Sequence, residues 1–272
     1  VREVLDVYRT LETHRDTIAS LAAIDTNVKQ GEYIETDLES AELIKVSSNA
    51  FLALKISFAN SIAILTDAVG ADITKVMAGV GADARIGQAF LNAGRGYGGG
   101  CFPKDVSGLI ASGLTHGVEL EIMQAARDIN SSMPGYVVEK LQTVLGGSIR
   151  NKTIAVLGLS FKSGTSDVRR SPSIALANLL DHFGAVVQAY DPQAMAEAAP
   201  ELHDPGWQKD SAIDALQGAD AVIIATNWLE FDAIEPSDYK HHMRGRVFVD
   251  AMNHFDRVSI ESAGLTYLGI GR

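Results

Sequence analysis

Residues 153–164 read TIAVLGLSFKSG, an apolar run of five residues that passes into a loop of small and polar residues. Such a short run is typical of a strand that is buried on both faces of a parallel sheet. A helical pattern follows at 173–183. Further strand patterns occur at 186–190, 221–225, 247–249 and 265–270. Strands that alternate with helices predict a doubly wound parallel sheet, and therefore an α/β fold, over residues 151–272.

The first part of the chain has helical patterns instead. TDLE at 36–39 has the spacing of a capping box, and neither glycine nor proline follows before Gly70. This predicts a helix of roughly 30 residues, about 45 Å long. Residues 50–63 are apolar around most of the helix, which predicts burial on most sides and suggests a partner subunit. Shorter helices are predicted at 72–80, 105–112, 120–129 and 134–145.

Composition narrows the class of protein. The net charge of −11 argues against a general nucleic-acid binder, which usually carries a basic surplus. No stretch approaches ~20 consecutive apolar residues and no secretory signal opens the chain, so we expect no membrane segment. The single cysteine, Cys101, fits a reducing compartment, which predicts a cytoplasmic protein.

The motif GGGCFPKD at 98–105 is the sharpest local feature. Pro103 suits the first turn of a helix, which places Cys101 near a helix N-terminus. The partial positive charge there, together with Lys104, favours the thiolate and makes it more nucleophilic. A lone cysteine is more often a small core residue. The polar, glycine-flanked setting favours the nucleophile here.

Two further sets of polar residues are candidates for a site. Lys45 and Asn49 share one face of the long helix, with Asn60 nearly on it, and a cation and an amide could stabilise an oxyanion. GLSFKSGT at 158–165 is a strand-to-helix loop of the phosphate-binding kind, but it lacks G-x-G-x-x-G, which argues against a dinucleotide site. Lys162 lies in that loop. Solvated surface charge is the alternative explanation for each lysine.

Several motifs occur together in one order. They are SAELIK at 40–45 with Asn49, RIG at 85–87, GYGGGCFPKD at 96–105, GLSFK at 158–162 with DVR at 167–169, and GIGR at 269–272. In this order they resemble the UDP-glucose/GDP-mannose dehydrogenase family, and the cysteine motif and the GIGR end are most similar to its UDP-glucose branch.

The resemblance implies a three-part architecture. An N-terminal Rossmann domain binds NAD, a long central helix forms a homodimer, and a C-terminal Rossmann-like domain helps to bind the UDP-sugar. Residues 1–36 are then expected to be the remnant of a missing NAD-binding domain. Residues 37–150 form the helical central domain with the cysteine loop, and residues 151–272 form the UDP-sugar-binding domain.

The resemblance also implies the chemistry, an NAD-dependent four-electron oxidation of the sugar C6 alcohol to a carboxylate through a cysteine thiohemiacetal and thioester. Cys101 is the implied nucleophile. Lys45 and Asn49 are implied to stabilise oxyanions and position water, and Asp105 to assist proton transfer. No metal is implied.

The binding residues follow from the same match. Arg85 is implied to reach the substrate of the neighbouring subunit, and Lys162 to lie on the substrate side. The loop 92–98 is implied to line the uridine and the sugar, with contacts from Asn92, Tyr97 and Gly98. Lys104 and Arg169 are implied to contact the cofactor.

One position departs from the family pattern. Many relatives carry the sequence Asp-Gly/Ala-Arg-Asn after a late strand, whereas this chain has DAMN at 250–253, with Met252 in place of the arginine. GDP-mannose or a UDP-N-acetylhexosamine therefore remain alternative substrates. A fragment that binds a nucleotide sugar and dimerises without turnover is the alternative of another class.

Overall fold

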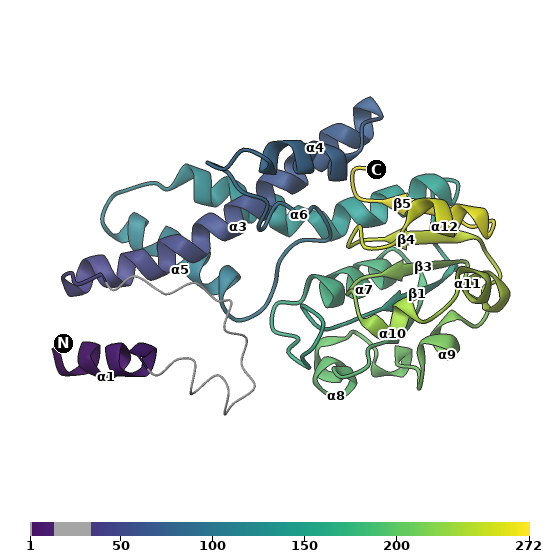
Figure 1. Cartoon of the computed structure of the whole chain (residues 1–272). Helices are drawn as coiled ribbons and strands as arrows, with labels where there is room; N and C mark the ends of the chain where they lie inside the picture. Colours follow the sequence, from purple (N-terminus) through teal and green to yellow (C-terminus); the bar gives the residue numbers. More distant parts are fainter. Residues whose placement is uncertain (1, 14–33) are drawn as a thin grey trace. The chain divides into compact units, whose positions relative to one another are not determined.

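The computed structural model describes residues 2–13 and 34–272 and divides the chain into two units, Val1–Ile44 and Lys45–Arg272. The helical elements come first and the alternating elements follow (Figure 1). The first helices are α1 (Arg2–Thr13), α3 (Leu38–Val69), α4 (Ile73–Gly81), α5 (Phe102–Thr115) and α6 (Glu121–Val144). The strands are β1 (Thr153–Leu157), β2 (Val186–Tyr190), β3 (Ala221–Ile224), β4 (Val247–Asp250) and β5 (Thr266–Gly269).

Short helices connect the strands. They are α7 (Pro172–His182), α8 (Met195–Ala198), α9 (Ala212–Leu216), α10 (Leu229–Asp232), α11 (Pro236–His242) and α12 (Arg257–Ser262), with single 3₁₀ turns at Ala199–Glu201 and Pro205–Trp207. Of these, only α7 was predicted as a helix. The others are four to seven residues long and too short to show a helical period.

All five strands are parallel, in the order β2-β1-β3-β4-β5. Alternate residues of β1 enter different cores. Ile154 and Val156 pack into a core that also contains residues of α3, α4, α6 and α7, whereas Ala155 and Leu157 pack with residues of α9, α11 and α12. Both faces of the sheet are therefore covered, which confirms the predicted Rossmann-like, doubly wound fold.

The long helix α3 is confirmed, with 32 residues. Its cap differs from the prediction: the Asp37 carboxylate accepts from the backbone amide of Ser40 at 2.7 Å, so Asp37 takes the capping role expected of Thr36. The helix ends before Gly70, whose φ of +73° is in the left-handed region that favours glycine.

The prediction that α3 is buried on most sides is wrong within this chain. Its buried residues are small or polar: Ala50, Ala53, Ser57, Ala59, Asn60, Ala63 and Thr66. Bulky residues that recur every seven positions stay outside, with Phe51 60%, Phe58 45% and Leu65 56% exposed. Small side chains let α3 approach its neighbours closely, and this leaves an apolar stripe on the outer face.

Among the described helices, α3 alone is long and apolar enough to cross a membrane. The count of consecutive apolar residues did not show this, because polar residues interrupt the helix. The core helix of a soluble protein meets the same criterion. Ser57 donates to the carbonyl of Ala126 at 2.6 Å and Asn60 accepts from the amide of Gly94 at 2.8 Å. These contacts place the middle of α3 in the core of the second unit.

The two helices predicted at 120–129 and 134–145 are one continuous helix, α6. Pro134 lies inside it, although proline removes a helical hydrogen bond. Met133, Pro134, Val137 and Val138 are all buried. Tertiary packing along this face therefore outweighs the local preference for a break.

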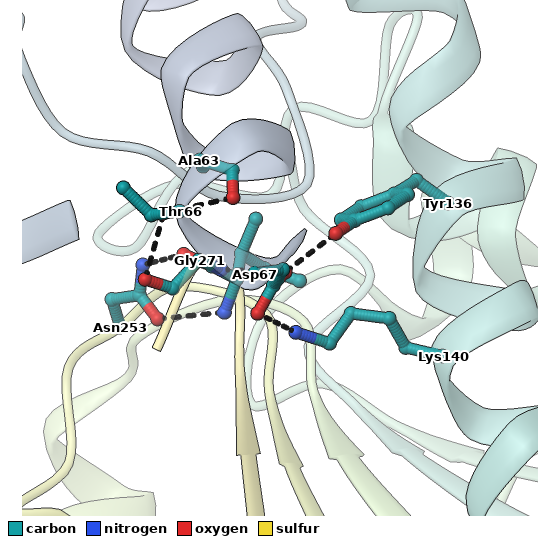
Figure 2. Close-up of polar contacts among 8 residues, drawn as sticks. Ala63, Thr66, Asp67, Tyr136, Lys140, Asn253 and Gly271 are labelled. Carbon is teal, nitrogen blue, oxygen red and sulfur yellow. Dashed lines mark hydrogen bonds and ion pairs between the residues drawn. The ribbon is translucent and has the colours of Figure 1, made fainter. Parts of the chain in front are cut away.

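The end of the chain is tied to α3 and α6 (Figure 2). The Asp67 carboxylate accepts from the Tyr136 hydroxyl at 2.5 Å and the Gly271 amide at 3.0 Å, and it pairs with Lys140 at 2.5 Å. The Thr66 hydroxyl lies 3.0 Å from the Gly271 carbonyl. Burial raises the pKa of Tyr136, and the hydrogen bond to the Asp67 carboxylate raises it further. The hydroxyl therefore keeps its proton and remains a hydrogen-bond donor.

Candidate active site

Cys101 is the residue that precedes α5, as the sequence predicts. Pro103 occupies the first turn, and the amide of Asp105 donates to the carbonyl of Cys101 at 2.9 Å. The thiol is exposed. Since α5 has 14 residues, its dipole places partial positive charge beside this thiol.

Asp105 gathers three of the predicted site residues one helical turn from Cys101. One carboxylate oxygen pairs with the ammonium of Lys45 and accepts from the Asn49 amide at 2.6 Å. The other oxygen accepts from Lys104 at 2.5 Å. Lys45 and Asn49 come from α3, whereas Lys104 and Asp105 come from α5, so packing of the two helices assembles the cluster.

The Asp105 side chain is only 2% exposed, so its charge depends on these partners. Hydrogen bonds from Lys104, Lys45 and Asn49 hold the pKa of Asp105 well below its usual range, against the opposing effect of burial. Asp105 is therefore ionised at neutral pH. It can hold two ammonium groups in place, but it cannot store a proton.

Arg169 lies beside the cysteine loop. Its carbonyl accepts from the amide of Gly99 at 2.8 Å. A Cβ added to Gly100 would lie 2.8 Å from the guanidinium carbon, so glycine permits this approach. Asp167 holds the guanidinium at 2.6 Å and raises the pKa of Arg169, with a smaller contribution from Cys101. Arg169 thus adds a fixed positive charge near the thiol.

A cavity of about 590 Å³ lies between the helices and the carboxyl edge of the sheet. Its walls include the loop 92–98, with the predicted residues Asn92, Tyr97 and Gly98, and the segment 252–254. Phe102 and Phe161 close part of it. Among the described residues that line the cavity there is no carboxylate, so it can accept an anionic ligand without like-charge repulsion.

Side-chain amides shape the loop 92–98, and sequence reasoning missed most of them. Asn130 of α6 accepts from the Tyr97 amide at 2.7 Å and donates to the Tyr97 carbonyl at 3.0 Å. Asn60 accepts from the Gly94 amide, so it belongs to this loop and not to the cluster of Lys45. Only the tertiary fold brings such partners together, because 33 or 34 residues separate them.

Asn253 was also missed. It has a φ of +52°, and its amide nitrogen donates to the carbonyls of Ala93, at 3.3 Å, and Ile270, at 2.8 Å. Its side chain therefore joins the cavity loop to the end of β5. The neighbouring Met252 lines the cavity.

Two of the predicted substrate residues do not reach the cavity within this chain. The Arg85 side chain is 88% exposed and pairs with Asp83 at 2.6 Å. Lys162 lies over the ring of Phe161, 5.6 Å from its centroid, and is not part of the cavity wall. Within residues 2–13 and 34–272, no group of three or more His, Cys, Asp or Glu side chains could hold a metal ion.

Comparison with known proteins identifies the family of this chain. Residues 39–132 match the central domain, and residues 155–257 the UDP-binding domain, of the UDP-glucose/GDP-mannose dehydrogenase family. The chain belongs to the UDP-glucose/GDP-mannose dehydrogenase family. The two matches lie on either side of the boundary between the helical part and the sheet.

Relatives in this family carry the name predicted from the motifs. UDP-glucose 6-dehydrogenase TuaD of Bacillus subtilis is 40% identical over 279 residues, which cover 100% of this chain and 60% of that protein. UDP-glucose 6-dehydrogenase of Rickettsia conorii is 38% identical, with 95% of this chain and 60% of that protein covered. The chain thus spans about 60% of the length of these relatives.

Solved structures of dehydrogenases are also similar. A UDP-glucose dehydrogenase from Pyrobaculum islandicum matches with a TM-score of 0.79 and 36% identity, over 94% of this chain and 56% of that one. A UDP-D-ManNAc dehydrogenase from Pyrococcus horikoshii matches with a TM-score of 0.75 and 27% identity, over 89% and 54%. The predicted family and fold class are confirmed.

Proposed function

We propose that this chain supplies the nucleotide-sugar site and the catalytic cysteine of a UDP-glucose 6-dehydrogenase, which oxidises C6 of UDP-glucose to UDP-glucuronate with NAD. The observation that carries the proposal is the Asp105 cluster. In it, Lys45 and Asn49 contact Asp105, which lies one helical turn along α5 from Cys101. Cys101 has an exposed thiol at the helix N-terminus, on the loop that continues from the wall of the cavity.

The proposed roles follow from the chemistry of an aldehyde intermediate. The Cys101 thiolate adds to the C6 aldehyde, and Lys45 and Asn49 stabilise the oxyanion of the thiohemiacetal. The second oxidation leaves a thioester on the same sulfur. Water, positioned by Lys45 and Asn49, attacks the thioester carbonyl and releases the carboxylate and the thiol. Asp105 assists proton transfer by holding Lys45 and Lys104 in place.

The cavity is the proposed site for the UDP-sugar. Asn92, Tyr97 and Gly98 would contact the uridine and the sugar, and Lys162 would approach from the sheet side. Arg85 does not line this cavity, and it would leave Asp83 to reach the site of a neighbouring subunit. The lack of arginine at Met252 keeps GDP-mannose and UDP-N-acetylhexosamines as alternative substrates.

NAD does not fit the sheet of this chain. The loop after β1 lacks G-x-G-x-x-G, and its amides at Leu159 and Ser160 already donate to Asp191, at 2.7 and 2.9 Å. We infer that NAD, which would remove a hydride from C6 in each oxidation, is held by a domain outside this chain. Lys104 and Arg169, beside the thiol, are the proposed contacts from this side.

The chain would have three parts in such an enzyme. Residues 1–36 would belong with the NAD-binding domain, 37–150 form the central domain and 151–272 bind the UDP-sugar. The exposed stripe on α3, defined by Phe51, Phe58 and Leu65, supports a homodimer formed through this helix. Partners such as nucleic acid or a membrane are not part of the proposal, and a free catalytic thiol suits the cytoplasm.

Turnover of the full-length protein tests this function. With NAD and a panel of nucleotide sugars, we expect UDP-glucose to give the highest kcat/KM, with two NADH formed per UDP-glucuronate. A preference for GDP-mannose would change the substrate and leave the mechanism standing. No NAD reduction with any nucleotide sugar would refute the dehydrogenase itself.

A further inference from the structure

The sheet has a point at which such folds usually bind ligands. The chain runs from β1 to β2 on one side and then returns to β3 on the other side of β1. In open parallel sheets, ligands bind at this switch point, outside the carboxyl ends of the two central strands. Here these ends lead into the loops 158–161 and 225–226.

The side chain of Arg95 occupies this position. Its Nε donates to the carbonyl of Ala225, after β3. One terminal nitrogen lies 3.0 Å from the Phe161 carbonyl, 3.3 Å from the Ser160 carbonyl and 3.1 Å from the Thr226 hydroxyl. The residue is 1% exposed, so a guanidinium from the helical part of the chain is enclosed between the loops after β1 and β3.

The amides that would receive a phosphate are also occupied. Asp191 follows β2, lies 1% exposed and accepts five hydrogen bonds, all between 2.7 and 3.1 Å. The donors are Leu159 N, Ser160 N, Gln193 N, Ala194 N and Trp228 Nε1. The chain's own carboxylate thus takes the place of an anionic ligand in the loop after β1.

Burying the charged guanidinium of Arg95 costs desolvation energy, which its hydrogen-bond partners must offset. Burial lowers the pKa of Arg95 to about 9, and the negative charge of Asp191 opposes this shift. Its hydrogen-bond partners are carbonyls and a hydroxyl, which match the fixed fork of a guanidinium. A lysine has a single ammonium and cannot reach the loops after β1 and β3 with the same geometry.

Arg95 also belongs to the cavity wall. Its backbone amide donates to the carbonyl of Ala251 at 2.8 Å, and its Nη1 lies 3.3 Å from the carbonyl of Gly96. Tyr97 and Gly98 follow directly and line the cavity. The guanidinium held between the loops after β1 and β3 therefore belongs to the segment that forms this wall of the cavity.

We propose that Arg95 is a positioning residue that fills the switch point of the sheet, closes the sheet to a dinucleotide, and fixes the loop 92–98 against the nucleotide-sugar cavity. The effect of Arg95 on substrate binding rests on the proposed function, whereas its effect on the conformation of the loop 92–98 does not. Arg95 is not proposed to contact the reacting groups. It acts through the backbone of Gly96, Tyr97 and Gly98.

The test compares Arg95→Ala and Arg95→Lys with Arg257→Ala in this chain. Arg257 is exposed and pairs with Glu261 within α12, which makes it a matched control. Hydrogen exchange of peptides covering 92–98 and 158–161 is measured by mass spectrometry. We expect exchange there to accelerate on the order of tenfold in both Arg95 variants and to stay unchanged in the control. Unchanged exchange in Arg95→Ala would overturn the proposal.

UDP-glucose affinity, measured by calorimetry, connects the loop to the site. We expect Kd to rise about tenfold or more in Arg95→Ala, because the loop must be ordered on binding. Millimolar methylguanidinium should restore both Kd and exchange in Arg95→Ala, and leave Arg95→Lys unchanged. If Arg95→Ala fails to fold, its folding in the presence of methylguanidinium is the readout, and failure to respond contradicts the proposal. Absence of binding by the wild-type chain would instead count against the proposed function.

Discussion

Asp67→Ala would remove the acceptor that ties the end of the chain to α3 and α6. The Tyr136 hydroxyl, the Gly271 amide and the Lys140 ammonium would each lose their partner. The Asp67 side chain is only 20% exposed and the Lys140 side chain only 15%, so water can replace the lost contacts only in part. Removing one partner of a buried ion pair costs about 3–5 kcal/mol. Because both side chains are still partly exposed to water, we expect a smaller loss, about 2–4 kcal/mol in the free energy of unfolding.

Urea unfolding followed by circular dichroism measures this loss, and thermal melts check it. For a chain of this size, 2–4 kcal/mol corresponds to a decrease in Tm on the order of 4–16 °C. Asp83→Ala is the matched control, because its partner Arg85 is 88% exposed and such a pair contributes about 1 kcal/mol or less. Asp67→Asn should fall between, since it keeps an acceptor but loses the charge. An Asp67→Ala variant as stable as the control, within about 0.5 kcal/mol, would refute the reasoning.

This 272-residue chain alone should form no NADH from NAD and UDP-glucose, and appreciable NADH would contradict a separate cofactor domain. Because the pKa of Asp105 is depressed by folding, its contribution to stability is present above about pH 4 and is lost as the pH falls further. The difference in unfolding free energy between wild type and Asp105→Asn should therefore shrink below pH 4, and a constant difference would be inconsistent with the ion pairs. Light scattering at micromolar concentration should show a dimer, and Phe58→Asp should shift the chain towards monomer. A monomeric wild type would contradict dimerisation through the stripe on α3.

Much of the fold can be predicted from local patterns. The strands at 153–157 and 186–190 are found at their predicted bounds, because short apolar runs between polar loops leave little choice of position. The long helix was predictable from the absence of glycine and proline. The break at Pro134 was not a reliable signal, because the packing of α6 is decided by residues far away in the sequence.

The candidate site can be predicted from the sequence only in part. The motif around Cys101 identifies the loop and its helix, since the chemistry lies in neighbouring residues. The partners of the loop 92–98 come from distant segments, and neither Asn130 nor Asn253 carries a local signal. Arg95 had one weak signal, a lone charge between glycines, but its place between β1 and β3 depends on the order of the strands.

The covalent role of Cys101 is the central claim, and one variant of the full-length enzyme tests it most directly. Cys101→Ser keeps the size of the side chain but replaces the thiolate with a much weaker nucleophile at neutral pH. We expect steady-state NADH formation from UDP-glucose to fall by about 10³-fold or more, while the Kd of UDP-glucose stays within a few-fold of wild type. NADH formation by Cys101→Ser within a few-fold of the wild-type rate would contradict the covalent mechanism.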